Sequence, residues 1–187
     1  ILDIKVESDF IIAVIQNDKF NRNSKVSMLV SKDGKNFHEA DVHIDVAYSV
    51  MTFLESSPSA LFLSVLDYSS HLKKFSLSTV YKSDSSGLRF SKILDRVQGN
   101  SVEKVLKIDG VWIANRAEEE SDEKEHSLLD MLMGGGLNAN IKTKMSFDDG
   151  VSWLPLKVTD DNCKVDDGCS LHLLSPNERD GSGKFVT

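Results

Sequence analysis

The sequence predicts an all-β fold that forms part of a β-propeller, and three observations lead to this prediction. A turn of one kind recurs along the chain, with its glycines at positions 34, 87 and 150. Each copy stands between short segments that are apolar or alternate between apolar and polar residues, which is the pattern of β-strands. A structural unit repeated at intervals of tens of residues indicates an array of similar sheets, because each sheet has an apolar face that it cannot bury alone.

The clearest copy of the turn is Ser146-Phe147-Asp148-Asp149-Gly150-Val151-Ser152-Trp153, which reads S-x-D-x-G-x-x-W. Gly150 suits a backbone position with positive φ, and Ser146 and Asp148 can accept hydrogen bonds from amides that the turn leaves unpaired. Trp153 is expected to pack over the start of the next strand. This pattern is the Asp box, a recurring hairpin of propeller blades.

Two looser copies precede it. The segment from Ser83 to Phe90 keeps the serine, Gly87 and the aromatic residue, with Ser85 at the position of the aspartate. The segment from Val30 to Phe37 keeps only Gly34 and the aromatic residue in register, with Asp33 directly before the glycine. The structural Asp-box residues predicted in these two copies are Ser83, Gly87, Phe90, Asp33, Gly34 and Phe37.

The strands group into three to four four-stranded blades. Predicted strands at 9–15, 25–31 and 37–42 belong to a first unit over residues 1–45, and those at 49–55, 60–65, 72–78 and 90–94 to a second over 46–98. A third unit over 99–160 has strands at 102–108, 111–115, 141–146 and 154–158, with an Asp109-Gly110 hairpin turn. Residues 161–187 would begin an incomplete fourth unit.

An acidic and glycine-rich insertion over 117–140 lengthens the third unit. The run Glu118 to Glu125 and the triplet Gly134 to Gly136 are typical of a solvated loop. The segment between them, Leu128 to Met133, is compatible with a short helix or an extra strand. The alternative to a plain loop is a contact surface for a cationic partner.

Composition narrows the classes of partner. The formal net charge is −7 and the sequence pI is about 5.2, which argues against nucleic acid, since phosphate binding needs a basic surface. No run of eighteen apolar residues occurs, so we expect no membrane contact by this stretch. The chain starts at Ile1 without a methionine and stops in what reads as a new strand, so we expect it to be part of a longer protein.

The two cysteines, Cys163 and Cys169, flank an Asp-Asp-Gly turn. A zinc site is poorly supported, because His172 could add a third ligand but no fourth is evident. A disulfide that closes a short loop and a pair of free buried thiols both remain open. A disulfide would place the chain in an oxidising compartment. We expect no metal ion and no cofactor.

With these residues in view, the chain resembles the lumenal propeller of sortilin-type vacuolar protein-sorting receptors, most closely the fungal members. The Asp-box hairpins resemble those of the family, and Cys169-Ser170-Leu171-His172-Leu173 resembles its C-S-L-H-L segment with a partner cysteine just upstream. The resemblance implies a Cys163–Cys169 disulfide and a larger ten-bladed propeller that supplies the remaining blades. It also implies a cysteine-rich module and a single membrane span further along the parent chain.

The resemblance further implies a function in binding. Such receptors carry soluble vacuolar hydrolases, carboxypeptidase Y among them, from the late Golgi to endosomes, so this stretch would lie on the lumenal side. His172 is expected to bond locally, although a titrating role in cargo release is the alternative. The residues that contact cargo are not marked by any motif.

The main competing interpretation is a sialidase-like glycosidase, since Asp boxes also occur in those enzymes. A sialidase needs three arginines that clamp a carboxylate, a Tyr-Glu pair and an acidic residue. The chain has five arginines, which are scattered: Arg22, Arg89, Arg96, Arg116 and Arg179. The paired carboxylates lie at turns, where aspartate serves as a cap. We therefore expect no enzymatic activity.

Overall fold

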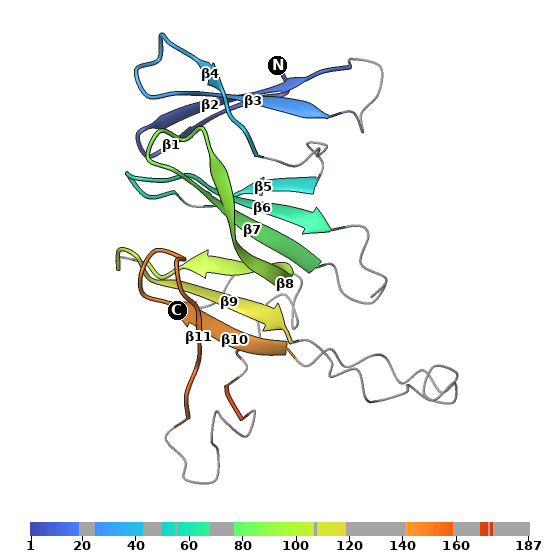
Figure 1. Ribbon diagram of the computed structural model, residues 1–187, viewed down its shortest axis with the longest axis vertical. Helices are drawn as coiled ribbons and strands as arrows, with labels where there is room; N and C mark the ends of the chain where they lie inside the picture. The colour runs from blue at the N-terminus through green and yellow to red at the C-terminus, as the bar shows by residue number, and fades with distance from the viewer. Residues whose placement is uncertain are drawn as a thin grey trace, which may run out of the picture. The chain divides into compact units, whose positions relative to one another are not determined.

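The computed structural model describes residues 1–18, 25–42, 50–54, 56–67, 77–106, 108–118, 141–158, 169–171 and 173. These residues form eleven β-strands and no α-helix (Figure 1). Within the same ranges, nothing has the helical length and hydropathy that crossing a membrane would require. The strand pairings established between the described residues are antiparallel, and the arrangement is consistent with a partial β-propeller. The predicted all-β fold class is thus confirmed, while the number of blades remains a prediction.

The chain divides into two compact units. Unit 1 comprises residues 1–67 and 79–95, and unit 2 comprises residues 68–78 and 96–187. The strands are β1 (Asp3–Glu7), β2 (Phe10–Gln16), β3 (Val26–Ser31), β4 (His38–Glu39), β5 (Met51–Phe53), β6 (Phe62–Asp67), β7 (Leu77–Ser83), β8 (Phe90–Lys104), β9 (Trp112–Ala117), β10 (Ile141–Ser146) and β11 (Leu154–Pro155).

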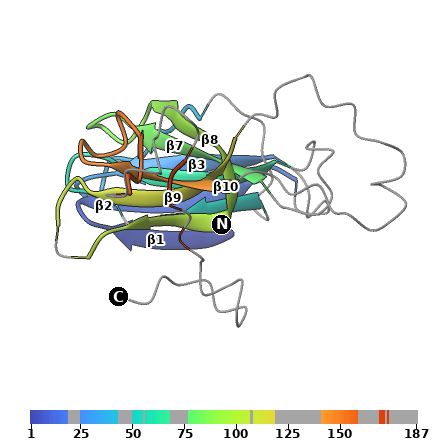
Figure 2. The ribbon, with the colours of Figure 1, turned by 90° about the horizontal axis from the view of Figure 1, so that it is seen from below.

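The first sheet of unit 1 has the order β1-β2-β3-β4. Figures 1 and 2 both show β1, β2 and β3 side by side. Strand β1 was not predicted from the sequence. Its alternation of charged and apolar residues, with Ile4 and Val6 exposed, pairs it with β2 in the register Glu7↔Phe10. A two-residue turn at Ser8 and Asp9 closes this hairpin, so the alternation was the signal that could have found the strand.

The remaining strands are hydrogen-bonded in the order β5-β6-β7-β8 and then β8-β9-β10-β11. The first set lies mainly in unit 1 and the second mainly in unit 2. Strand β8 therefore serves both groups, where the sequence had predicted two strands at 90–94 and 102–108. The physical reason is a bend within one continuous strand. Arg96 and Gly99 both have positive φ, and the pairing of β8 with β9 shifts register between Val97 and Val102. Such a bulge bends a strand without ending it.

The core of unit 1 is a single apolar cluster. Alternate residues of β2 and β3 point into it, and β5, β6 and the start of β8 supply the rest. Its buried members are Phe10, Ile12, Val14, Met28, Val30, Met51, Leu61, Leu63, Val65 and Phe90. Burying apolar side chains of this size stabilises a fold by roughly 1.5–3 kcal/mol each. The first sheet is therefore fixed to the second through packing.

Backbone contacts reinforce this packing inside unit 1. The chain leaving β4 forms a parallel bridge between Asp41 and Arg89, with Asp41 donating its N–H to the Leu88 carbonyl at 2.7 Å. The turn before β8 also approaches the core closely. A β-carbon placed on Gly87 would lie 2.9 Å from the Phe10 ring and 2.9 Å from a methyl group of Val30. Glycine at 87 is thus required by proximity as well as by its φ of 79°.

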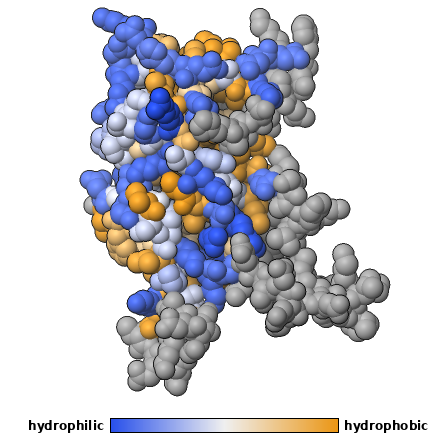
Figure 3. All heavy atoms as spheres, in the orientation of Figure 1, coloured by the Kyte–Doolittle hydropathy of each residue, from blue (hydrophilic) through white to orange (hydrophobic). Residues whose placement is uncertain are grey.

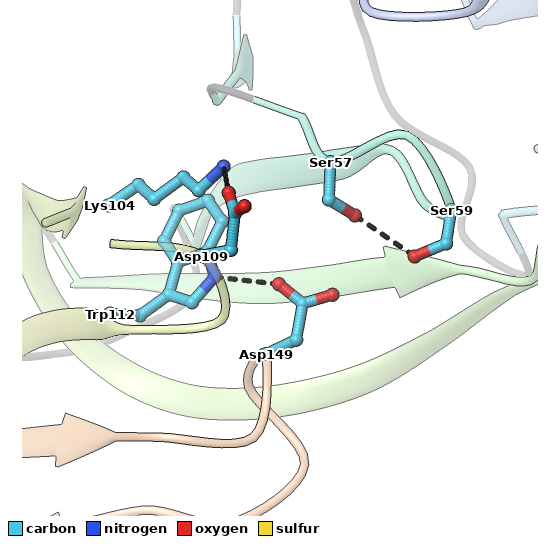
Figure 4. A network of polar contacts seen from close by, with 6 residues as sticks. All are labelled: Ser57, Ser59, Lys104, Asp109, Trp112 and Asp149. Atoms are coloured by element: carbon cyan, nitrogen blue, oxygen red, sulfur yellow. Dashed lines mark hydrogen bonds and ion pairs between the residues drawn. The ribbon is translucent and has the colours of Figure 1, made fainter. Parts of the chain in front are cut away.

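Unit 2 is organised around Trp112, which is fully buried on β9. Its indole N–H donates to the Asp149 carboxylate at 3.0 Å, and Lys104 lies 3.4 Å from Asp109 nearby (Figure 4). The tryptophan predicted from the sequence to pack over a strand is Trp153. Trp153 is only half-buried, and its indole N–H bonds the Gly150 carbonyl of its own turn at 3.1 Å. The core tryptophan of this unit is therefore Trp112.

The contact of Gly87 with the core gives a first prediction. We expect Gly87→Ala to destabilise the protein by roughly 2–4 kcal/mol, because the new methyl group combines left-handed strain of about 1 kcal/mol with overpacking of about 1–3 kcal/mol. Chemical denaturation monitored by hydrogen exchange of unit 1 amides measures this loss.

Gly99→Ala is the matched control. Gly99 also has positive φ, at 51°, but nothing lies within 4 Å of its β-carbon position. We expect it to cost only about 1 kcal/mol. Equal losses for the two variants would show that the approach to Phe10 and Val30 has no energetic weight.

Candidate functional site

The turn after β10 is built on two side chains, Ser146 and Asp148. The Ser146 hydroxyl donates to Asp148 at 2.8 Å and accepts the Gly150 N–H at 2.9 Å. The Asp148 carboxylate accepts both the N–H and the hydroxyl of Ser152, at 2.8 and 2.6 Å. Gly150 has a φ of 85°. The two side chains thus satisfy amides that a tight turn cannot pair through its backbone.

The turn after β3 has the same arrangement. Ser31 donates to Asp33 at 3.0 Å and accepts the Gly34 N–H at 3.0 Å, while Asp33 accepts the N–H of Asn36 at 2.8 Å. The Asn36 side chain also donates to Asp33 at 2.7 Å. Asp33, Gly34 and Phe37 are the residues predicted for this copy. The structure adds Ser31 as the partner of Asp33, which the S-x-D spacing could have indicated.

The turn after β7 is held by a different residue from the one expected. Asp84 accepts the N–H groups of Ser86 and Leu88 at 3.1 and 3.2 Å, together with the Ser86 hydroxyl at 2.6 Å. Ser85, predicted to replace the aspartate, is exposed. Ser83 is engaged across the sheet, since its hydroxyl accepts the buried Leu61 N–H at 2.8 Å. The aspartate therefore lies one residue earlier than the pattern suggested.

The three aromatic residues of the turns differ in packing. Phe90 is buried in the core of unit 1, whereas Phe37 is exposed and Trp153 is half-buried. The expectation that each aromatic side chain packs over the next strand therefore fits Phe90 alone. A turn held by its own polar side chains does not need the aromatic residue as an anchor.

The hydrogen bonds of these turns lower the pKa of each carboxyl group. Bonds from the hydroxyl and N–H of Ser152, and then from Ser146, lower the pKa of Asp148 to about 2. The N–H groups of Asn36 and Lys35 lower the pKa of Asp33, and the Ser86 hydroxyl lowers that of Asp84. A carboxylate that accepts several hydrogen bonds is stabilised in its charged form. The turns accordingly keep their ionised aspartates in mildly acidic solution.

A buried polar network in unit 2 holds the C-S-L-H-L segment. Asn115 and Thr143 are fully buried, and the Thr143 hydroxyl donates to the Asn115 side chain at 2.7 Å. The Asn115 amide donates to the Leu173 carbonyl at 2.8 Å, and the Leu173 N–H donates to the Thr143 hydroxyl at 2.7 Å. Leu171 accepts the Thr143 N–H and donates to Leu156. Because unpaired buried polar groups are costly, these two side chains fix this segment against β10.

Several cations gather around Glu118, the residue that directly follows β9. Lys144 lies 2.7 Å from Glu118, Arg116 lies 3.9 Å from it, and Arg96 donates to the Glu118 carbonyl at 2.7 Å. Lys142 is paired across the strands with Arg116. Lys144 and Arg116 are mostly covered, with side chains 17% and 23% exposed. We call Arg96, Arg116, Lys142, Lys144 and Glu118 the basic cluster.

Two features of the basic cluster oppose stability. Arg116 and Lys142 face each other across β9 and β10, a like-charge pair that disfavours pairing. Arg96 holds a φ of 54°, which is strained for a residue with a side chain. The φ of Arg96 belongs to the bulge that bends β8, so the like-charge pair is the feature that makes this cluster a candidate site. The cluster was not predicted from the sequence, where the alternation of Lys142 and Lys144 along one strand was the available signal.

The remaining predicted site residues fall mainly outside the described ranges. Cys163, His172 and the insertion beyond Glu118 are not among the described residues, whereas Cys169 is described and half-buried. Across the residues that the structure describes, no three metal-binding side chains come together. The basic cluster is the arrangement of the described residues that best fits a ligand, and the ligand chemistry that it fits is a carboxylate or another anion.

The pKa of Asp148 gives a prediction for acid stability. A depressed pKa contributes stability that is fully present above the ordinary value near 3.8 and is lost as the pH falls toward 2. Asp148→Asn should therefore lower the thermal unfolding midpoint equally at pH 7 and pH 5, and the difference from wild type should shrink between pH 4 and pH 2. The exposed turn residue Asp9, changed to Asn, is the control. A difference that already disappears at pH 5 would contradict the hydrogen-bonded turn.

Known proteins match this chain along its whole length. The family described as sortilin, neurotensin receptor 3 (Sortilin-Vps10) matches residues 1–187. A vacuolar protein sorting/targeting protein 10 of Debaryomyces hansenii is 61% identical over 190 residues, covering 100% of this chain and 12% of that relative. Proteins of the same name from Candida dubliniensis and Lodderomyces elongisporus are 48% and 49% identical over 189 residues, again covering 100% of this chain.

The chain spans only about an eighth of the length of these relatives, with 12%, 12% and 13% of each covered. Their names describe sorting and targeting to the vacuole, and the family is one of sorting receptors rather than of enzymes. The match extends from the first residue to the last, through both compact units. The chain therefore belongs to the sortilin/Vps10 family of sorting receptors.

Proposed function

We propose that this chain is a lumenal, cargo-binding part of a receptor that carries soluble vacuolar hydrolases from the late Golgi to endosomes. The family match over residues 1–187 and the names of the fungal relatives support this proposal. The parent protein would be a single-pass membrane receptor, and the remaining blades of its propeller would complete the binding surface. Carboxypeptidase Y or a similar hydrolase is the proposed cargo.

Within this chain, we propose the basic cluster as the site that binds cargo. Lys144 and Arg116 lie at the Glu118 carboxylate, Arg96 bonds the Glu118 backbone carbonyl, and Lys142 faces Arg116 across the strands. These four cations gather in a chain whose net charge is −7. A ligand carboxylate would offset the repulsion between Arg116 and Lys142, and partial burial would strengthen that interaction relative to water. The partner group we propose for this site is therefore an acidic side chain or chain terminus of the cargo.

We prefer a binding function to glycosidase activity for this chain. Among the described arginines, Arg96 and Arg116 both engage Glu118, whereas Arg89 is exposed in unit 1 beside Asp41. The positions of the described arginines thus favour a pair rather than the three-arginine clamp of a sialidase. Membership in a receptor family supports the same conclusion.

Binding of the carboxypeptidase Y propeptide to the full-length lumenal region tests the cargo site. We expect Arg116→Gln and Lys142→Gln each to weaken binding about tenfold, or about 1.4 kcal/mol, because each removes a cation from the carboxylate contact. The loss should diminish at high salt, since charge interactions are screened. Binding should be stronger near neutral pH than at endosomal pH, and the isolated chain should bind poorly.

Lys92→Gln is the matched control. Lys92 is exposed, lies 3.8 Å from Asp95 and belongs to unit 1, whereas the basic cluster belongs to unit 2. It should leave cargo affinity unchanged. Unaltered affinity in the two cluster variants, with native hydrogen exchange of β9 and β10, would refute the assignment of the cluster. Hydrolysis of a sialoside that Arg116→Gln abolishes would instead refute the receptor function of this stretch.

The Cys163–Cys169 disulfide is the second part of the proposal. Cys169 is half-buried at the start of the C-S-L-H-L segment, and Cys163 is the other cysteine of the sequence. A bridge there would stabilise the C-S-L-H-L segment that Asn115 and Thr143 hold, chiefly by restricting the unfolded chain. Peptide mapping of secreted, unreduced protein should recover both cysteines in one linked peptide. Two thiols that alkylate freely would contradict the bridge and the lumenal location it supports.

A further inference from the structure

Two neighbouring turns of unit 2 expose large apolar side chains. Leu106 and Ile108, in the turn between β8 and β9, are 62% and 51% exposed. Phe147 and Val151, in the turn after β10, are 65% and 73% exposed. We call these four residues the turn patch. Figure 3 shows apolar atoms at the surface on the lower left, where Figure 1 places these turns.

The two turns are held together rigidly. The Asp149 N–H donates to the Gly110 carbonyl at 2.8 Å, and the β-carbon position of Gly110 lies 3.6 Å from the Phe147 carbonyl oxygen. The buried Trp112 side chain also donates a hydrogen bond to Asp149 at 3.0 Å (Figure 4). The exposed side chains therefore stand on a preorganised backbone, which reduces the entropy lost when a partner binds.

The turn itself does not require apolar residues at these positions. The turn after β3 has the same hydrogen bonds, from Ser31 to Asp33 and from Gly34 to Ser31. At the positions of Phe147 and Val151 it carries Lys32 and Lys35, which are exposed. The phenylalanine and the valine are thus not explained by turn geometry. Exposed apolar groups gathered in one place indicate a contact surface.

The surroundings of the turn patch are acidic. The Asp109 side chain is fully exposed, at 101%, and Asp148 and Asp149 lie between Phe147 and Val151. One described cation, Lys104, lies 3.4 Å from Asp109, and its side chain is 10% exposed. Charge complementarity therefore favours a partner that carries basic side chains and disfavours an anionic lipid surface. In an array of stacked sheets, neighbouring sheets cover each other's faces but not the turns at the strand ends. Further sheets of the same kind would therefore leave the turn patch exposed.

We propose that the turn patch is a docking surface for a second protein, through a segment that combines apolar with lysine or arginine side chains. The apolar residues of the turn patch would pack against apolar side chains of the partner, and the aspartates around them would pair with its lysines or arginines. This surface shares no residue with the basic cluster and differs from it in chemistry, since the cluster would contact acidic groups. The proposal does not depend on the identity of the cargo.

Site-specific photo-crosslinking in the full-length protein tests this docking surface. A photoreactive benzoyl-phenylalanine placed at 147 should give a defined adduct with one other protein, mapped by mass spectrometry to a segment that mixes apolar and basic residues. The adduct should fall at least tenfold in Val151→Lys. Adducts only to lipid, only within the same chain, or to acidic segments would each overturn the proposal.

The turn after β3 supplies matched variants. Phe147→Lys with Val151→Lys copies the lysines of that turn, so the fold should persist, as native hydrogen exchange of β9 and β10 would show. A synthetic peptide of alternating leucine and lysine should bind wild type at least tenfold more tightly than this double variant. A leucine–glutamate peptide should bind neither. Equal binding of the leucine–lysine peptide to wild type and double variant would refute the patch.

Discussion

The structure depends on one recurring interaction, an aspartate carboxylate that collects the unpaired hydrogen-bond donors of a tight turn. Asp33, Asp84 and Asp148 each do this at the end of a strand. A turn satisfied in this way needs no packing partner above it, and it delivers the chain to the next strand in a fixed direction. The close approach of Gly87 to Phe10 follows from that direction, since the turn after β7 aims its glycine into the core of unit 1.

Buried polar side chains position a chain segment inside unit 2. Asn115 and Thr143 occupy buried positions where apolar residues would pack well, and they exchange hydrogen bonds with the backbone of Leu173. A satisfied buried pair of this kind specifies one arrangement, because any displacement of the segment would leave several groups unpaired. The C-S-L-H-L segment is therefore positioned by chemistry that differs from the apolar packing of unit 1.

The basic cluster and the turn patch show how a β-sheet separates two chemistries. Arg116 of β9 and Lys142 and Lys144 of β10 share one face of the sheet. Partial burial there strengthens their interaction with an anion relative to water. The turns at the strand ends instead present apolar side chains to solvent on a backbone that Trp112 and Asp149 anchor. Both sites place unfavourable features on rigid elements, and a receptor needs such rigidity to recognise a partner without large reorganisation.

The sequence by itself determined the all-β class, the family, and the turns at Gly34, Gly87 and Gly150, because turn chemistry and strand periodicity are local properties. It also located most strands. Tertiary structure decided that β8 is one bent strand, that Trp112 rather than Trp153 is the core tryptophan, and that Asp84 replaces Ser85 in its turn. It alone assembled the basic cluster, since Arg96, Arg116 and Lys142 are distant in sequence. Such contacts arise from strand pairing over long separations, and no local pattern encodes them.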